Sequence, residues 1–80
     1  MQFDTDKWLT KKWETDSRFY VATIIQNLFG QWEVDRSWGS KQSKRGGGMI
    51  TLADSFDEAL AMLADIDKRR QSRNYTKVST

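Results

Sequence analysis

The sequence predicts a small α+β domain, with an antiparallel β-sheet of four or five strands and one helix packed on one face. Three observations lead to this fold class. Residues 18–26 and 31–38 are rich in β-branched and aromatic side chains. Between them, Asn27-Leu-Phe-Gly30 predicts a hairpin turn, since Asn and Gly tolerate positive φ. Residues 55–70 carry apolar side chains at helical spacing. A chain of 80 residues has the length of one domain, so residues 1–80 are expected to fold as a single unit.

The expected strands follow one another along the first two thirds of the chain, and a short one closes it. We expect strands at residues 7–13, 18–26, 31–38, 49–53 and 75–78. Residues 14–17 are typical of a turn, since Asp and Ser side chains bond to nearby backbone. The strand at 18–26 is apolar at both parities, which indicates a central strand covered at least in part on both faces.

The third expected strand alternates clearly and then meets a glycine-rich segment. Trp32, Val34, Arg36 and Trp38 fall on one face of this strand, and Glu33, Asp35 and Ser37 fall on the other. Trp32 is expected in the core, whereas Trp38 is expected either in the core or partly exposed. Three consecutive glycines predict that residues 39–48 form a loop without regular structure.

The expected helix has clear signals at both ends. Ser55-Phe-Asp-Glu58 matches a capping box, in which the Ser55 hydroxyl accepts a hydrogen bond from the Glu58 N–H. The apolar stripe consists of Phe56, Ala59, Leu60, Leu63 and Ile66. Lys68, Arg69 and Arg70 suit the negative end of the helix dipole, and Asn74 is expected to stop the helix in a left-handed conformation.

Composition argues against several classes of function. Cysteine and histidine are absent, which removes disulfides, thiolate metal sites and the commonest general base. Asp54, Asp57, Asp65 and Asp67 lack a partner base, so no catalytic site, metal site or cofactor is expected. No apolar run approaches the length of a membrane span, and the polar first residues do not resemble a signal peptide. We expect a soluble, cytoplasmic, non-enzymatic protein.

The net charge of +2 conceals a segregation of charge. Nine cations and no acid fall within residues 36–50 and 68–80, which leaves four basic and eleven acidic residues elsewhere. The cations of residues 41–45 have no expected partner within the chain. Aromatic rings beside such cations suit a nucleic-acid surface, because rings stack on bases and cations meet phosphates. The alternative is a solvated helix end and a flexible loop.

Several short motifs occur in one order along residues 18–75. They are Arg18-Phe-Tyr20, Leu28-Phe-Gly-Gln-Trp32, Arg36-Ser-Trp-Gly-Ser40, Gly46-Gly-Gly48, Glu58-Ala-Leu-Ala61 and Arg73-Asn-Tyr75. In this order they resemble the WGR domain family, and most closely its stand-alone bacterial members. Ser40 stands where the family motif has an arginine, and Asn74 stands where it has a glycine.

The resemblance implies a non-catalytic module that contacts DNA backbone or DNA ends, as this domain does in some poly(ADP-ribose) polymerases. No ADP-ribosyl transferase region is recognisable in the sequence. Together with the charge segregation, the resemblance predicts a nucleic-acid surface made of Arg36, Trp38, Lys41, Lys44, Arg45, Lys68, Arg69 and Arg73. Arg36 has a structural alternative, in which it stacks between Trp32 and Trp38. The alternative function is a protein–protein interaction module without nucleic-acid binding.

Overall fold

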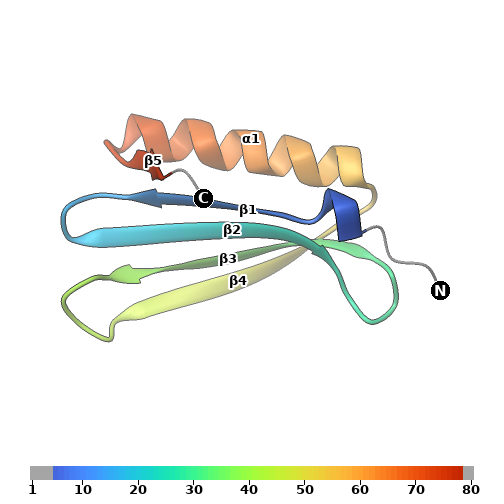
Figure 1. Cartoon of the computed structure of the whole chain (residues 1–80), viewed down its shortest axis with the longest axis horizontal. Coiled ribbons are helices and arrows are strands. Elements are labelled where there is room, and N and C mark those ends of the chain that lie inside the picture. Colours follow the sequence, from blue (N-terminus) through green and yellow to red (C-terminus); the bar gives the residue numbers. More distant parts are fainter. Residues whose placement is uncertain (1–4, 79–80) are drawn as a thin grey trace.

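A five-stranded antiparallel sheet forms one layer of the protein, and a single helix covers one of its faces (Figure 1). The computed structural model describes residues 5–78. The elements are η1 (Thr5–Lys7), β1 (Leu9–Glu14), β2 (Arg18–Gln26), β3 (Trp32–Ser40), β4 (Gly46–Ala53), α1 (Phe56–Ser72) and β5 (Thr76–Val78). The predicted fold class is therefore confirmed. The first strand begins two residues later than expected, because residues 5–7 form a short 3₁₀ turn.

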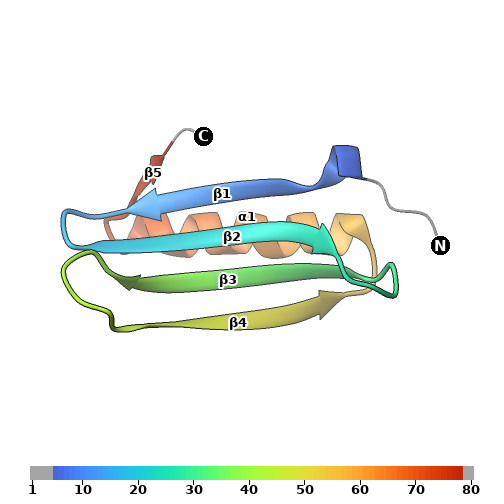
Figure 2. The same ribbon diagram turned by 60° about the horizontal axis from the view of Figure 1, so that its bottom comes forward.

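The strand order β4-β3-β2-β1-β5 follows from simple connections (Figure 2). Strands β1 to β4 are joined by successive hairpins, and α1 then carries the chain back across the sheet so that β5 pairs with β1. In the central pair, Tyr20 lies opposite Trp38 and Ile24 lies opposite Val34. Strands β1 and β3 and helix α1 all finish at the same end of the molecule (Figures 1 and 2).

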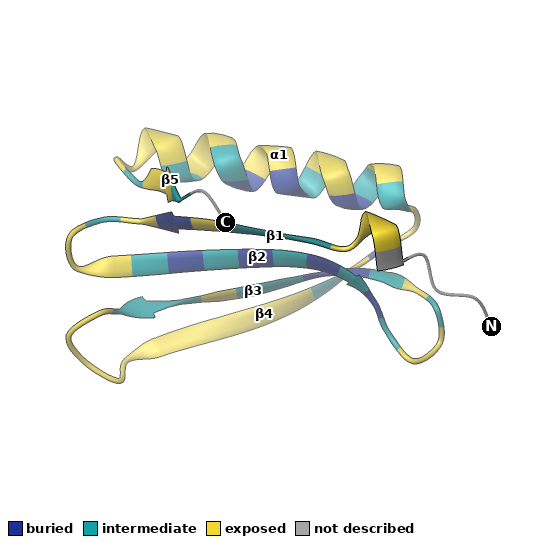
Figure 3. Cartoon of the chain, viewed as in Figure 1, coloured by how far each residue is buried: buried dark blue, intermediate teal, exposed yellow. Residues whose placement is uncertain are grey.

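The core lies between the sheet and the helix, where the buried bands of the two layers face each other (Figure 3). It consists of Trp13, Tyr20, Ala22, Ile24, Val34, Ala53, Ala59, Leu63 and Ile66. The Trp13 indole N–H donates to Asp67 Oδ1 at 2.8 Å, which satisfies the one polar atom of this buried ring. Trp32 packs against the core as expected, with its ring centroid 5.0 Å from that of Phe56.

The opposite face of the sheet has no covering layer among residues 5–78. Val21 and Ile25 of β2 point to this face and are half-buried. The apolar character of β2 on both parities correctly marked it as a central strand. Its second face, however, is covered only by neighbouring side chains.

Local signals set the ends of α1. Ser55 Oγ accepts from the Glu58 N–H at 3.1 Å, and the Glu58 carboxylate accepts from the Asp54 N–H at 3.1 Å. At the other end Asn74 adopts φ 66°, as predicted. Of the apolar stripe predicted for the helix, Ala59, Leu63 and Ile66 are buried against the sheet. Leu60 lies at the border of the packed face and is 38% exposed.

In the first two turns of the sheet, side-chain oxygens accept hydrogen bonds from backbone N–H groups. Thr15 Oγ1, rather than the expected Asp or Ser oxygen, accepts from the N–H of Arg18 at 3.0 Å. In the next turn Asn27 Oδ1 accepts from the N–H groups of Phe29 and Gln31, and Gly30 takes φ 77°. The predicted turn at residues 27–30 is therefore confirmed.

The glycine-rich segment differs from the expectation of an irregular loop. Strand β3 continues to Ser40 and β4 begins at Gly46, so residues 46–48 are paired with β3. A Cβ at Gly47 would lie 3.1 Å from the Trp38 indole, and a Cβ at Gly39 would lie 3.1 Å from the Phe19 ring. Because glycine has no side chain, the Trp38 ring packs directly on Gly47 and the Phe19 ring packs directly on Gly39. This packing offsets the entropic cost of ordering glycine.

Gly46→Ala is expected to lower the free energy of unfolding by about 1–3 kcal/mol. A Cβ at this position would lie 2.4 Å from the Trp38 carbonyl oxygen, so the backbone of β3 or β4 must shift. Gly48→Ala is the matched control, because its Cβ would approach the Arg36 carbonyl oxygen no closer than 3.0 Å. At Gly48 the reduced entropy of the unfolded chain offsets part of the crowding. Urea titration of both variants tests this ranking, and equal losses would contradict it.

Candidate nucleic-acid interface

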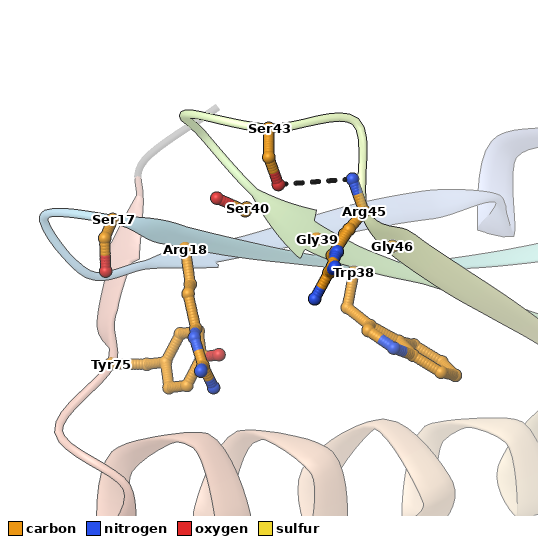
Figure 4. Close-up of a pocket in the computed structure, with 9 residues that line it drawn as sticks. All are labelled: Ser17, Arg18, Trp38, Gly39, Ser40, Ser43, Arg45, Gly46 and Tyr75. Atoms are coloured by element: carbon orange, nitrogen blue, oxygen red, sulfur yellow. Dashed lines mark hydrogen bonds between the residues drawn. The ribbon is translucent and has the colours of Figure 1, made fainter.

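A cavity of about 600 Å³ opens where β1 and β3 end, close to the C-terminal end of α1 (Figure 4). The β1–β2 turn, the β3–β4 turn and the segment after the helix meet there. Its lining consists of Ser17, Arg18, Trp38, Gly39, Ser40, Ser43, Arg45, Gly46 and Tyr75. Two arginines, two aromatic rings and three serines thus surround one space, and no carboxylate of residues 5–78 lines it.

Trp38 is positioned from both sides by its neighbours in the sheet. Its ring stacks on Tyr20 of β2, with centroids 5.8 Å apart and planes 12° from parallel, and it lies over Gly47 of β4. Trp38 is therefore half-buried at the border of the core while it also lines the cavity. Within residues 5–78 its indole N–H has no hydrogen-bond acceptor, so this donor is free to meet a ligand.

The half-buried Arg70 side chain connects the core to the far wall of the cavity. The Arg70 guanidinium carbon lies 4.3 Å from the centroid of Tyr20 and 5.1 Å from that of Tyr75. Arg70 Nε is buried without a hydrogen-bond partner, so its contacts there are with the rings. Arg70 thereby holds Tyr75, which follows the helix, beside residues of β2 and β3.

The two arginines of the lining come from different turns. Arg18 begins β2 and lies opposite Ser40, the last residue of β3. Arg45 precedes β4, and its carbonyl accepts from the Ser40 N–H at 3.1 Å. Neither arginine forms an ion pair within the described part of the chain, so both charges are available to an anion.

Of the other cations predicted for the surface, Lys41 has a partner that the sequence did not reveal. Its Nζ lies 3.0 Å from Glu14 Oε2, and its N–H donates to the Ser17 carbonyl at 2.8 Å. The expectation that this lysine has no partner within the chain is therefore wrong. These contacts tie the β3–β4 turn to the β1–β2 turn, although the ion pair is exposed and contributes little stability by itself.

The remaining predicted residues lie outside the cavity lining. Arg36 is half-buried on the helix-facing side of β3, with its Nε unpaired, and Lys44 is exposed in the β3–β4 turn. Arg69 forms an exposed ion pair with Asp65 at 3.1 Å. Lys68 is exposed about 180° around the helix from Ala59. Arg73 is the exposed C-cap of α1, two residues before Tyr75.

The structure thus brings two predicted residues, Trp38 and Arg45, into one site and adds others that sequence reasoning did not select. The added residues are Ser17, Arg18, Ser40, Ser43 and Tyr75, with Arg70 behind them. Strand pairing was the signal that could have found Arg18, because the hairpin turn at residues 27–30 fixes which residues of the two strands face each other.

Comparisons of the chain with models of protein families, with curated proteins and with solved structures found no match. The resemblance to the WGR domain therefore stays a prediction. No helix among residues 5–78 is long and apolar enough to cross a membrane. The same residues contain no cluster of three or more acidic side chains that could hold a metal ion.

Proposed function

We propose that this protein binds the backbone or the ends of DNA through the cavity lined by Arg18, Trp38, Arg45 and Tyr75. The observation that carries this proposal is the composition of the lining, which within residues 5–78 joins two guanidinium groups without ion pairs to two rings and includes no carboxylate. Guanidinium groups bind phosphate with two parallel hydrogen bonds, and aromatic rings stack on bases or sugars. Serine hydroxyls and the backbone around Gly39 and Gly46 add further hydrogen-bonding groups.

The resemblance to the WGR domain supports DNA as the ligand. Two other arginines in the cavity lie beside the position where the family motif has its arginine. Ser40 occupies that motif position and itself lines the cavity. Arg18 lies opposite Ser40, and Arg45 is bonded to it through the backbone, so two guanidinium groups flank the position. Lys44 and Arg73 are exposed beside lining residues and extend the positive field. Lys68 and Arg69 contribute at longer range.

Binding should depend steeply on salt and weakly on sequence, because phosphate contacts release counterions and carry no base information. The test uses fluorescence anisotropy with short single-stranded, blunt-ended and nicked DNA at about 50 and 200 mM salt. Arg18→Glu with Arg45→Glu is expected to weaken binding more than about tenfold and to lower the magnitude of the salt slope by about 0.7–0.9 per lost contact.

The matched control is Lys7→Glu with Lys12→Glu, which makes the same change in net charge at exposed positions outside the cavity and outside the predicted surface. We expect this control to weaken binding less than about threefold, because screening limits the effect of distant charges. The proposal fails if the parent protein does not bind DNA at low salt. It fails equally if both double variants lose the same affinity.

The uncovered face of the sheet favours a protein partner as the second candidate function. On this face Ile50 is 66% exposed and Leu52 is 56% exposed, and in the adjoining β2–β3 turn Leu28 is 86% exposed. Exposed apolar patches of this kind mark sites of protein interaction. Such binding would survive Arg18→Glu with Arg45→Glu, which separates it from the DNA proposal.

A further inference from the structure

A second cavity, of about 500 Å³, lies at the uncovered face of the sheet, next to the β2–β3 turn. Its lining consists of Trp8, Ile25, Gln26, Asn27, Leu28, Glu33 and Asp35. Ile25, Glu33 and Asp35 point away from the helix, so this site is separate from the cavity proposed for DNA. Its walls are largely apolar, and its two ionisable groups are both carboxyls.

The Glu33 side chain is buried, and Asp35 beside it is half-buried with one buried carboxylate oxygen. Glu33 is only 7% exposed, and it lies between Ile25 of β2 and Leu52 of β4. Asp35 follows two residues later on the same face, and its Oδ1 is buried without a hydrogen-bond partner. Within residues 5–78, no N–H group and no cation bonds to either side chain. Buried acids normally have such a partner, and residues 5–78 supply no positive group to this pair.

In these surroundings Glu33 keeps its proton to a higher pH than an ordinary glutamate. The hydrogen bond with Asp35, burial and repulsion from Asp35 raise the pKa of Glu33 from 4.5 to about 7. Among residues 5–78, the elements around Glu33 supply no cation. Trp8, the β2–β3 turn, Ile25 and Leu52 are uncharged. Lys7 lies 5.3 Å from the Phe56 ring on the helix side, and the exposed Lys12 of β1 lies opposite Val21, two strands from β3. A shared proton leaves Asp35 Oδ1 without a donor.

We propose that this cavity binds a primary ammonium group carried on an apolar stem, the chemistry shared by a lysine side chain and a free alkylamine. The three N–H donors of an ammonium can reach both carboxyls, including the unpaired oxygen of Asp35. The stem would lie against Ile25, Leu28 and the ring of Trp8, which form the apolar wall. This inference stands apart from DNA binding, since it uses other residues on the other face of the sheet.

The test compares n-hexylamine with 1-hexanol, which has the same stem but no charge, by NMR titration of the Trp8 indole and the Ile25 and Leu28 amides. Near pH 8 we expect saturable binding of hexylamine that is at least about tenfold tighter than that of hexanol. Lowering the pH to about 6 should weaken hexylamine binding, because the proton on Glu33 competes with the ammonium. The amine itself stays charged in this range, since its pKa is about 10.4.

Glu33→Gln with Asp35→Asn is expected to remove the preference for hexylamine over hexanol, whereas Lys12→Gln should leave it unchanged. Two blocked tripeptides, acetyl-Leu-Lys-Leu-amide and its Lys→Gln counterpart, distinguish the sources of the ammonium. Tighter binding of the lysine peptide than of hexylamine would assign the site to a partner protein, and the reverse order would assign it to a free amine. Equal binding of hexanol and hexylamine, or a preference that survives the Gln/Asn variant, would overturn the proposal.

Discussion

Leu63→Ala is expected to lower the free energy of unfolding by about 2–5 kcal/mol, the largest loss among the core changes considered. Leu63 is only 6% exposed and lies at the centre of the helix face that packs on the sheet. Truncation of the Leu63 side chain would remove its apolar contacts with the sheet and with the rest of the core, and would leave a void. The strands on one side and the helix on the other limit how far that void can collapse.

Leu60→Ala provides the matched control, since it makes the same chemical change on the same helix at a residue that is 38% exposed. We expect it to cost less than about 1 kcal/mol, because little buried surface is lost and the border position can relax. Urea titrations followed by circular dichroism would give both values, with unchanged slopes showing that the two-state comparison holds. A larger loss for Leu60→Ala would mean that the helix presents a different face to the sheet.

Elements specified by adjacent residues were predictable from the sequence. The bounds of β2, the turn at residues 27–30 and the Ser55–Glu58 cap depend on strand propensity, positive φ and one side-chain acceptor, all of which act over a few residues. The continuation of β3 and β4 through the glycines was not predictable in this way. It depends on the Trp38 ring lying over Gly47, a contact between strands that no local pattern encodes.

The same distinction between local and long-range contacts explains the candidate site. Trp38 and Arg45 stand in a segment that is conspicuous for its rings and cations, so sequence reasoning found both. Arg18 and Tyr75 are distant in sequence, and they reach the cavity only through the pairing of β2 with β3 and the stacking on Arg70. Glu14 likewise meets Lys41 because two turns lie at the same edge. Charge counting along the chain does not detect such pairs.

Alternation along β3 placed Glu33 and Asp35 on one face, and the structure shows that this face is the one without a helix. A charge there would ordinarily be solvated. Glu33 is instead enclosed by apolar neighbours from β2 and β4 and by a second carboxyl. The free energy of unfolding is therefore linked to the protonation of Glu33, whose pKa is raised.

The free energy of unfolding is therefore expected to fall as the pH rises from about 5 to about 8, by on the order of 1–3 kcal/mol. Folding raises the pKa of Glu33 from 4.5 to about 7, so the folded state holds a proton that the unfolded state has released. The stabilisation is complete below about pH 4.5 and is lost as the pH passes through about 7. The absence of histidine and cysteine leaves few other groups that titrate in this window.

Glu33→Gln should remove this slope and make the variant more stable than the parent near pH 8, since a neutral amide still donates to Asp35 without repelling it. Glu14→Gln is the control, because it also removes one carboxylate from the sheet but at an exposed position. Urea titrations at about pH 5, 6, 7 and 8 would measure all three proteins. A slope that persists in Glu33→Gln would place the proton on another group and remove the electrostatic reason for an empty ammonium site.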